Sequence, residues 1–252
     1  MASKIALLVV SCEKYRDLWA PFFHCLRKYW PTCPYSVTLG TDGDDVSFGD
    51  VAMVRARPGR SYSASLREML SQIGEEWVLT WGEDLLLCRS VSGDMAMKVI
   101  HGCVEDGCGF ARLLCTHPLA IDAPKHREYG PLPRGIRYRV SMMVSLWRKD
   151  MLVSLLRDDE SAWEFEKRGS RRSDEYREPF MGMSAELAQR PPIQVVNTVV
   201  KGCWTREGAR LLRREGFSSR LTGRPMESIW SLLYRRAYLA RLKSLTILGR
   251  YW

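Results

Sequence analysis

Short apolar runs and amphipathic segments alternate along the first third of the chain. Residues 4–10 form a continuous apolar run rich in Val, Leu and Ile, which is typical of a strand covered on both faces of a parallel sheet. A polar loop follows, and apolar residues then recur at helical spacing from Trp19 to Trp30. Pro21 suits the first turn of such a helix, and Pro31 closes it. The pattern predicts a strand, a loop and a helix in succession.

The same pattern recurs twice more. Residues 35–39 alternate like a strand and break at the acidic, turn-rich loop 40–45. A short strand is expected over residues 51–54, a helix over 66–73 and an apolar strand over 77–81. This alternation predicts an α/β fold with a doubly wound sheet.

The pattern is less regular further along the chain. We predict helices over residues 92–105 and 149–157, and strands over 139–147 and 193–200. Four prolines and no periodicity predict a long loop over residues 116–135.

Composition and cysteine spacing narrow the class of protein. The composition, 46% hydrophobic and 27% charged, is that of an ordinary globular protein. The length of 252 residues is enough for one large α/β domain or two small ones. No apolar run approaches the roughly 18 residues of a membrane span, and nothing marks the chain for export. Scattered cysteines without a CxxC pair indicate buried thiols in a reducing cytosol, with a Cys103/Cys108 metal or redox site as the alternative. The cysteines are Cys12, Cys25, Cys33, Cys88, Cys103, Cys108, Cys115 and Cys203.

Carboxylates mark the first candidate site. In doubly wound sheets, ligands bind at the carboxyl ends of the strands, so loops 11–14, 41–45 and 82–84 are the expected rim. Glu83 and Asp84 suit a divalent cation that bridges phosphate oxygens, whereas an acidic turn exposed to solvent is the plainer alternative. Because adjacent side chains of an extended chain point to opposite faces, one of the two is expected to reach a ligand, and we favour Asp84.

A second acidic group lies in the predicted helix after Ser161. Glu164, three residues on, has the capping-box position. Glu166 lacks such a local role, and beside Trp163 and Phe165 its pKa could be raised enough for general-base catalysis toward a hydroxyl. A surface glutamate paired with Lys or Arg is the alternative.

Three stretches of the chain resemble a known family. LLVVSCEKYRDLWAPFFHCLRKYWPTCPYSV, YSASLREMLSQIGEEWVLTWGEDLLL and SLWRKDMLVSLLRDDESAWEFEKRGSRRS are similar to bacterial glycosyltransferases of the GT-A fold from surface-polysaccharide gene clusters. The resemblance runs from about Ile5 to Trp204. It implies a catalytic domain over residues 1–204, with a nucleotide-sugar half over about 1–115 and an acceptor half over about 136–204. Residues 205–252 are then a basic helical extension.

The resemblance also implies roles for individual residues. Glu166, with Glu164 second, corresponds to the carboxylate base of inverting enzymes, and Asp84 to a metal-binding residue for Mg²⁺ or Mn²⁺. The sequence Glu83-Asp84-Leu85 departs from the usual Asp-x-Asp, which puts metal dependence in doubt. The residues expected to bind the nucleotide-diphosphate sugar are Ser11, Cys12, Glu13, Tyr15, Asp42, Ser63, Glu83 and Lys201.

The tail holds most of the charge. The formal net charge is +9, and residues 204–252 contain eleven Lys or Arg against three Asp or Glu. A helix is predicted over residues 226–252, with one face formed by Ile229, Trp230, Leu233, Ala237 and Ala240. An anionic membrane surface is a candidate partner, nucleic acid is disfavoured, and a solvated helix docked on the core is the plain alternative.

Together these features predict a glycosyltransferase that moves a sugar from a nucleotide-diphosphate donor to a glycan or lipid-linked acceptor. The expected location is cytoplasmic, with peripheral attachment to the inner face of the membrane as a further expectation. Two other functions stay open: a non-catalytic protein that binds a nucleotide, glycan or nucleic acid, and a nucleotidyltransferase.

Overall fold

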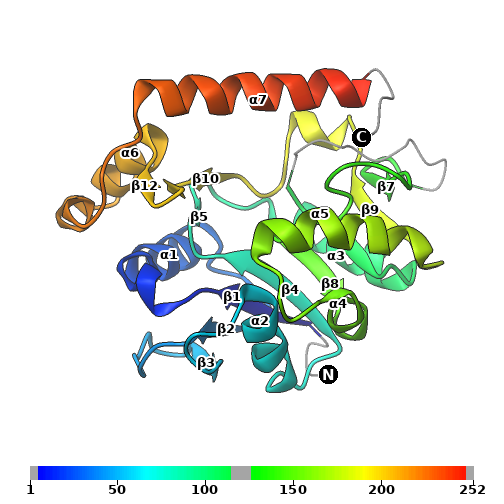
Figure 1. Ribbon diagram of the computed structural model, residues 1–252, viewed down its shortest axis with the longest axis horizontal. Coiled ribbons are helices and arrows are strands. Elements are labelled where there is room, and N and C mark those ends of the chain that lie inside the picture. The colour runs from blue at the N-terminus through cyan, green and yellow to red at the C-terminus, as the bar shows by residue number, and fades with distance from the viewer. Residues whose placement is uncertain (1–4, 115–125, 248–252) are drawn as a thin grey trace.

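The computed structural model describes residues 5–114 and 126–247 (Figure 1). Within these residues the main sheet has eight strands in the order β3-β2-β1-β4-β8-β6-β9-β7. The strands are β1 (Ile5–Val10), β2 (Ser36–Thr41), β3 (Ala52–Arg55), β4 (Trp77–Gly82), β6 (Phe110–Arg112), β7 (Tyr129–Pro131), β8 (Ser145–Arg148) and β9 (Phe180–Met183).

The sheet is mixed. Strands β3, β2, β1 and β4 are parallel, β8 runs antiparallel to both of its neighbours, and β6 and β9 are again parallel to each other. Val10 at the end of β1 pairs with Gly40 on one side and Gly82 on the other, so three carboxyl ends meet at one edge. The start of β8 lies at this same edge because β8 runs the opposite way.

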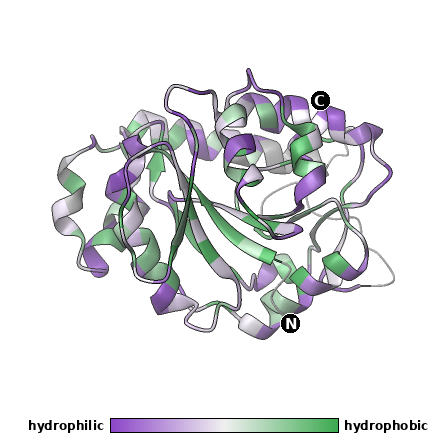
Figure 2. Cartoon of the chain, turned by 90° about the horizontal axis from the view of Figure 1, so that it is seen from below, coloured by the Kyte–Doolittle hydropathy of each residue, from purple (hydrophilic) through white to green (hydrophobic). Residues whose placement is uncertain are grey.

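Helices cover both faces of the sheet, which confirms the doubly wound α/β prediction (Figure 1). Leu7 and Val9 of β1 pack with α1 and α3, whereas Ala6 and Leu8 pack with α2, α4 and α5. The apolar strands lie in the middle of Figure 2, between helices that turn hydrophilic residues outward. The helices are α1 (Arg16–Tyr29), α2 (Tyr62–Ser71), α3 (Gly93–Glu105), α4 (Lys149–Leu155), α5 (Ala162–Arg172), α6 (Arg206–Arg214) and α7 (Ile229–Ile247).

Two small ribbons lie beside the sheet. Strand β5 (Leu85–Leu87) pairs with β10 (Val195–Asn197), and β11 (Val199–Val200) pairs with β12 (Cys203–Trp204). Short 3-10 turns complete the described structure: η1 (Glu13–Tyr15), η2 (Ser173–Glu175), η3 (Leu187–Gln189) and η4 (Ser218–Thr222).

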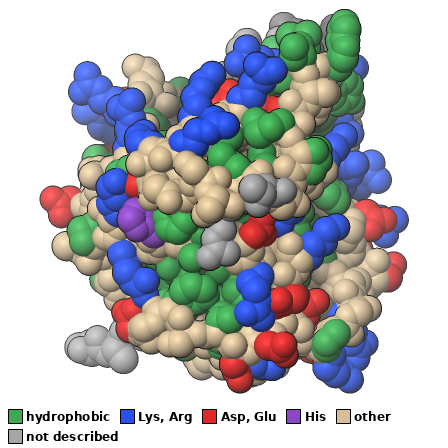
Figure 3. Space-filling model, turned by 90° about the vertical axis from the view of Figure 1, so that its left-hand side faces the viewer, with side chains coloured by type: hydrophobic (Ala, Val, Ile, Leu, Met, Phe, Trp, Pro, Cys, Tyr) green, Lys and Arg blue, Asp and Glu red, His purple; other side chains and the backbone are tan. Residues whose placement is uncertain are grey.

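Helices α6 and α7 lie in the C-terminal part. The helix predicted over residues 226–252 is observed as α7 over Ile229–Ile247, and residues 248–252 lie outside the described residues. Leu211 and Leu212 of α6 join the core cluster that contains β1 and α1. Helix α7 crosses the top of the molecule in Figure 1, and Lys and Arg side chains gather in the upper part of the face seen in Figure 3. No helix among the described residues combines the length and apolarity that a membrane crossing requires.

Several predicted boundaries were wrong. Helix α1 begins at Arg16, so Pro21 lies inside the helix rather than in its first turn. The strand expected over residues 139–147 begins only at Ser145, because backbone amides before it donate to side chains: Val140 to Ser170, and Met142 to Glu166. The loop expected over residues 116–135 contains β7, while residues 115–125, with Cys115, lie outside the described residues.

Candidate functional site

The loops that follow β1, β2 and β4 form the rim of the candidate site. Asp42, after β2, holds the first loop in place because its Oδ1 accepts a hydrogen bond of 2.7 Å from the backbone amide of Glu13. Burial raises the pKa of the Cys12 thiol, and the nearby charges of Glu83 and Asp42 raise it further. The structure therefore brings Cys12, Glu13, Asp42 and Glu83 to one place.

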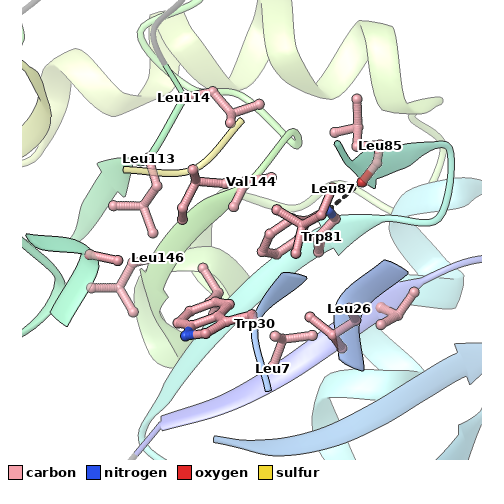
Figure 4. Close-up of a cluster of buried hydrophobic side chains, with 14 of the residues drawn as sticks. Leu7, Leu26, Trp30, Trp81, Leu85, Leu87, Leu113, Leu114, Val144 and Leu146 are labelled. Carbon is pink, nitrogen blue, oxygen red and sulfur yellow. Dashed lines mark hydrogen bonds between the residues drawn. The ribbon is translucent and has the colours of Figure 1, made fainter. Parts of the chain in front are cut away.

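The turn between β4 and β5 carries Glu83 and Asp84 in a fixed conformation. The indole Nε1 of buried Trp81 donates to the carbonyl oxygen of Leu85 at 2.8 Å across this turn (Figure 4). The carbonyl oxygen of Asp84 accepts from the backbone amide and the hydroxyl of Thr198, at 2.7 and 2.9 Å. Glu83 is buried and Asp84 is partly exposed, so Asp84 is the better placed of the two to meet a ligand.

Both carboxyl groups of this turn resist ionisation. Burial raises the pKa of Glu83 well above its usual value, and the charge of Asp84 raises it further. Burial also raises the pKa of Asp84, to about 6, although its backbone hydrogen bond and Arg224 act in the opposite direction. Two like charges at a poorly solvated turn repel each other, so ionising both Glu83 and Asp84 costs free energy in the folded state.

Glu166 lies on α5 and is tied to the segment before β8. Its Oε1 accepts from the backbone amide of Met142 at 2.8 Å and from the hydroxyl of Ser141 at 3.1 Å. Burial raises the pKa of Glu166, and these two hydrogen bonds and the charge of Arg112 oppose that rise. The Glu166 carboxylate is therefore held in place by two neutral donors.

Arg112 supports this arrangement from the end of β6. Burial lowers the pKa of its guanidinium to about 10, and the charge of Glu166 opposes that change. Its Nη2 donates to the carbonyl oxygen of Tyr138, a residue held at a φ of 55°. The hydroxyl of Tyr138 lies 3.0 Å from that of Tyr238 on α7, so a chain of contacts joins α7 to the neighbourhood of Glu166.

Tyr62, the first residue of α2, links the two acidic groups. Burial raises the pKa of its hydroxyl, and the charges of Glu166, Glu83 and Asp84 each raise it further. The charges of all three carboxylates therefore act on the Tyr62 hydroxyl. The hydroxyl of neighbouring Ser63 is buried and has no hydrogen-bond partner among the described residues.

Glu164 has the local role that its spacing predicts. Its Oε2 accepts from the backbone amide of Ser161 at 3.0 Å, and Ser161 Oγ accepts from the amide of Glu164, which completes a capping box. Hydrogen bonds from the Ser161 amide and the Ser161 hydroxyl to the carboxylate lower the pKa of Glu164. Two residues apart on a helix, Glu164 and Glu166 point about 200° away from each other.

Arg224, from the segment before α7, joins the rim from the far end of the chain. Its guanidinium donates to both carboxylate oxygens of Asp17, at 2.7 and 2.8 Å, and to the carbonyl oxygen of Lys14 at 2.9 Å. It lies 4.3 Å from the ring centroid of Tyr15. A cavity of 420 Å³ opens beside it, lined by Lys14, Asp17, Gly202, Gly223, Arg224 and Pro225.

The remaining predicted donor-binding residues lie close to this rim. Ser11 Oγ accepts a hydrogen bond of 2.7 Å from Trp19 Nε1, which fixes the loop against α1. Lys201 and Gly202, both at positive φ, form the two-residue turn between β11 and β12, and the Lys201 side chain is exposed. Gly202 lines the same cavity as Arg224, so Lys201 stands at its border.

A divalent cation would find few ligands here. Among the described residues, no three His, Cys, Asp or Glu side chains are grouped so that they could hold a metal ion. Asp84 beside Glu83 offers carboxylate oxygens of the kind that Mg²⁺ and Mn²⁺ prefer, and Mg²⁺ is commonly held by one or two carboxylates plus phosphates and water. These two side chains would therefore supply only part of the ligands of such a cation.

Sequence reasoning missed Tyr62, Arg112, Ser141 and Arg224. Arg112 has a signal in hindsight, since it interrupts the apolar run 110–114 and its side chain is buried. The other three lie in turns or at a helix start, where no periodicity separates them from ordinary surface residues.

Comparisons with known proteins give a fold. No protein-family model matches the chain, and no curated protein matches its sequence. The structure of S. aureus TarS 1-349 in complex with UDP is similar at a TM-score of 0.51 and 10% identity, covering 96% of this chain and 71% of that one. A longer S. aureus TarS structure is similar at 0.50 and 10% identity, covering 98% of this chain and 43% of that one. TarS is a GT-A glycosyltransferase, and the likeness shows that this chain has a GT-A-like fold.

Proposed function

We propose that the protein is a glycosyltransferase that uses a nucleotide-diphosphate sugar. The observation that carries this proposal is that two acidic groups lie at one strand-end edge of a GT-A-like sheet. Glu83 and Asp84 follow β4, and the segment that binds Glu166 leads into β8, which begins where β4 ends. Glu166 suits the acceptor side of the reaction, and Glu83 with Asp84 suits the donor side.

Glu166 is the proposed general base. Its carboxylate takes the proton of an acceptor hydroxyl while the hydroxyl oxygen attacks the anomeric carbon of the donor. The bond from that carbon to the diphosphate oxygen breaks, and the nucleoside diphosphate leaves with the electron pair. The raised pKa makes Glu166 a stronger base, and Met142 and Ser141 hold its carboxylate in place. In-line attack of this kind inverts the anomeric configuration.

The donor is proposed to bind along the rim. Ser11, Cys12, Glu13, Tyr15 and Asp42 lie in the segments after β1 and β2 where the nucleotide would bind. Ser63 on α2 and Glu83 after β4, both buried, are the further proposed donor-binding residues. Asp84 would hold Mg²⁺ or Mn²⁺, which when bound neutralises charge on the leaving diphosphate. Lys201 lies at the border of the cavity beside Arg224, where its positively charged side chain would contact the same diphosphate.

The acceptor is proposed to be a glycan or a lipid-linked saccharide, approached from the Glu166 side. This division assigns residues 1–115 to donor binding and residues 136–204 to acceptor binding. The proposed location is cytoplasmic.

A donor screen tests the proposal. The purified chain is incubated with UDP-, GDP-, CMP- and dTDP-sugars, with and without Mn²⁺, and nucleotide release and thermal stability are measured. We expect at least one donor to raise the melting temperature and to release its nucleotide. Release of pyrophosphate would instead indicate a nucleotidyltransferase. No response to any donor, with salt-dependent retention of RNA or DNA, would indicate a nucleic-acid-binding protein.

A further inference from the structure

Helix α7 turns its apolar face to solvent. The residues that sequence periodicity places on one face are all exposed, rather than packed on the core: Ile229, Trp230, Leu233, Ala237 and Ala240. The exposed fractions of the three largest are 59% for Ile229, 81% for Trp230 and 49% for Leu233. A surface helix normally buries such a face, so this orientation calls for a partner.

Polar contacts hold α7 to the rest of the chain. Arg235 Nη2 lies 3.2 Å from the carboxylate of buried Glu227 and 3.6 Å from that of Glu207 on α6. Tyr238 contacts Tyr138 through their hydroxyls. The inner side of α7 is thus fixed by charge and hydrogen bonds, which leaves the apolar stripe outside.

Basic side chains border this stripe. Arg236 and Arg241 are exposed, and on a helical wheel they fall on opposite flanks of the stripe. Arg236 Nη2 also lies 3.8 Å from the carboxylate of Glu207 on α6, so Arg236 lies on the flank nearer the rest of the chain. Exposed Met226 precedes the stripe, and exposed Tyr234 lies at its margin. Hydrophobic side chains lie among Lys and Arg in the upper part of Figure 3, the region that contains α6 and α7 in Figure 1.

We infer that the outer face of α7 is a docking surface for an anionic membrane. The stripe enters the boundary between headgroups and acyl chains, and Arg236 and Arg241 reach lipid phosphates. Tryptophan and tyrosine favour this boundary because one end of each ring is apolar and the other is polar. A second copy of the chain is a poorer occupant, since pairing two stripes would crowd four exposed arginines together.

This inference goes beyond the proposed function and does not depend on it. If both hold, the contact between Tyr238 and Tyr138 keeps the Glu166 side of the site close to the bilayer, where a lipid-linked acceptor is found.

Vesicle sedimentation tests the inference. The full chain is spun with vesicles of equal parts phosphatidylcholine and phosphatidylglycerol, and with phosphatidylcholine alone. We expect sedimentation with the anionic vesicles only, and weaker sedimentation as salt rises because screening removes the attraction of exposed arginines.

Two variant pairs separate the apolar and basic contributions. Trp230→Ser combined with Leu233→Ser should weaken the partition constant about tenfold or more. Trp163→Ser, at a tryptophan of α5 that is 66% exposed, is the matched control and should leave binding unchanged. Arg236→Gln and Arg241→Gln should each weaken binding about fivefold, whereas exposed Arg177→Gln, before β9, should not.

Several outcomes would overturn the inference. Equal sedimentation with neutral and anionic vesicles, or full binding by the Trp230 and Leu233 variant, would rule out this surface. A dimer in sedimentation velocity that the same variant converts to monomer would assign the stripe to a second copy. All substitutions are at exposed positions, and a thermal unfolding scan of each variant checks that the fold is retained.

Discussion

Buried carboxylates in two regions of this molecule have pKa shifts of opposite sign. Glu215, at the end of α6, has a fully buried side chain that accepts from Lys28 Nζ at 2.6 Å, Tyr29 OH at 2.6 Å and Arg214 Nε at 3.0 Å. His24 Nε2 lies 3.3 Å away. Burial would raise the pKa of Glu215, but these donors outweigh it and lower the pKa to about 2.

The carboxylates of the candidate site lack enough donors to offset their burial. Burial raises the pKa of Glu83, Asp84 and Glu166, and the hydrogen bonds and charges around them do not reverse the rise. The difference shows that this fold can surround a buried carboxylate with enough donors to stabilise its ionised form, as it does where α1 meets α6. We therefore expect Glu215 to stabilise the fold, and Glu83, Asp84 and Glu166 to act on a ligand at some cost in the free energy of unfolding.

The largest expected effect is on catalysis. Glu166→Gln keeps the size of the side chain and removes the base, so kcat should fall about a thousandfold. The affinity for the donor should change little, because the proposal assigns Glu166 to the acceptor side. Steady-state kinetics and donor titration calorimetry measure the two quantities.

Glu164→Gln is the matched control for that variant. It removes a carboxylate two residues away that belongs to the capping box, so kcat should stay within about twofold while stability drops by up to about 1 kcal/mol. Equal losses of kcat in the two variants would contradict the division of roles.

Glu215→Gln should give the opposite result. Removing a charge that three donors share should lower the free energy of unfolding by about 2–3 kcal/mol, with kcat of the folded enzyme unchanged. Because the folded pKa of Glu215 is lowered, its contribution is present above the unfolded pKa of about 4.3 and lost as pH falls toward 2. Denaturant unfolding at several pH values checks this. A constant difference down to pH 2 would contradict it.

Asp84→Asn should stabilise the protein at neutral pH. Because the folded pKa of Asp84 is raised to about 6, its contribution is full below the unfolded pKa of about 3.9 and is lost as pH rises through 6. The variant should therefore exceed the wild type by about 1–3 kcal/mol at pH 8, yet bind the donor about tenfold more weakly.

Asp159→Asn, at an exposed residue in the turn before α5 and outside the rim loops, is the control for Asp84→Asn and should change neither quantity. If Asp84→Asn lowers stability at pH 8, Asp84 is a structural residue like Glu215 and the comparison between the two groups fails.

The smallest expected effect is at the contact between α7 and the site. Tyr238→Phe removes one hydroxyl partner of Tyr138 and should cost about 0.5–1 kcal/mol, seen as faster hydrogen exchange in α7. Tyr234→Phe, at an exposed tyrosine that stacks on Tyr238, should leave exchange unchanged. The same exchange rates in both variants would show that the hydroxyl pair does not hold α7.

Much of the fold could be predicted from the sequence. Buried parallel strands such as β1 and β4 are continuous apolar runs, and α5 begins at a capping box that two residues, Ser161 and Glu164, specify. Strands β6 and β9, of three and four residues, are too short to show a period. The rim loops were predictable because the carboxyl ends of neighbouring parallel strands meet at one edge.

The supporting part of the site was not predictable. Arg224 meets Asp17 across 207 positions of the chain, and Glu166 meets Met142 across 24, so neither contact leaves a local pattern. The sequence predicted the apolar face of α7 but left open whether it meets a membrane surface or the core, because periodicity identifies a face and not the side of the helix that packs.

The stereochemistry of the product tests the central claim most directly. The donor found in the screen is incubated with an acceptor, and proton NMR follows the anomeric signal of the first-formed product. The proposed attack, with Glu166 as base, predicts release of the nucleoside diphosphate and an anomeric configuration opposite to that of the donor. A retained configuration, or release of the nucleotide without transfer to any hydroxyl acceptor, would contradict it.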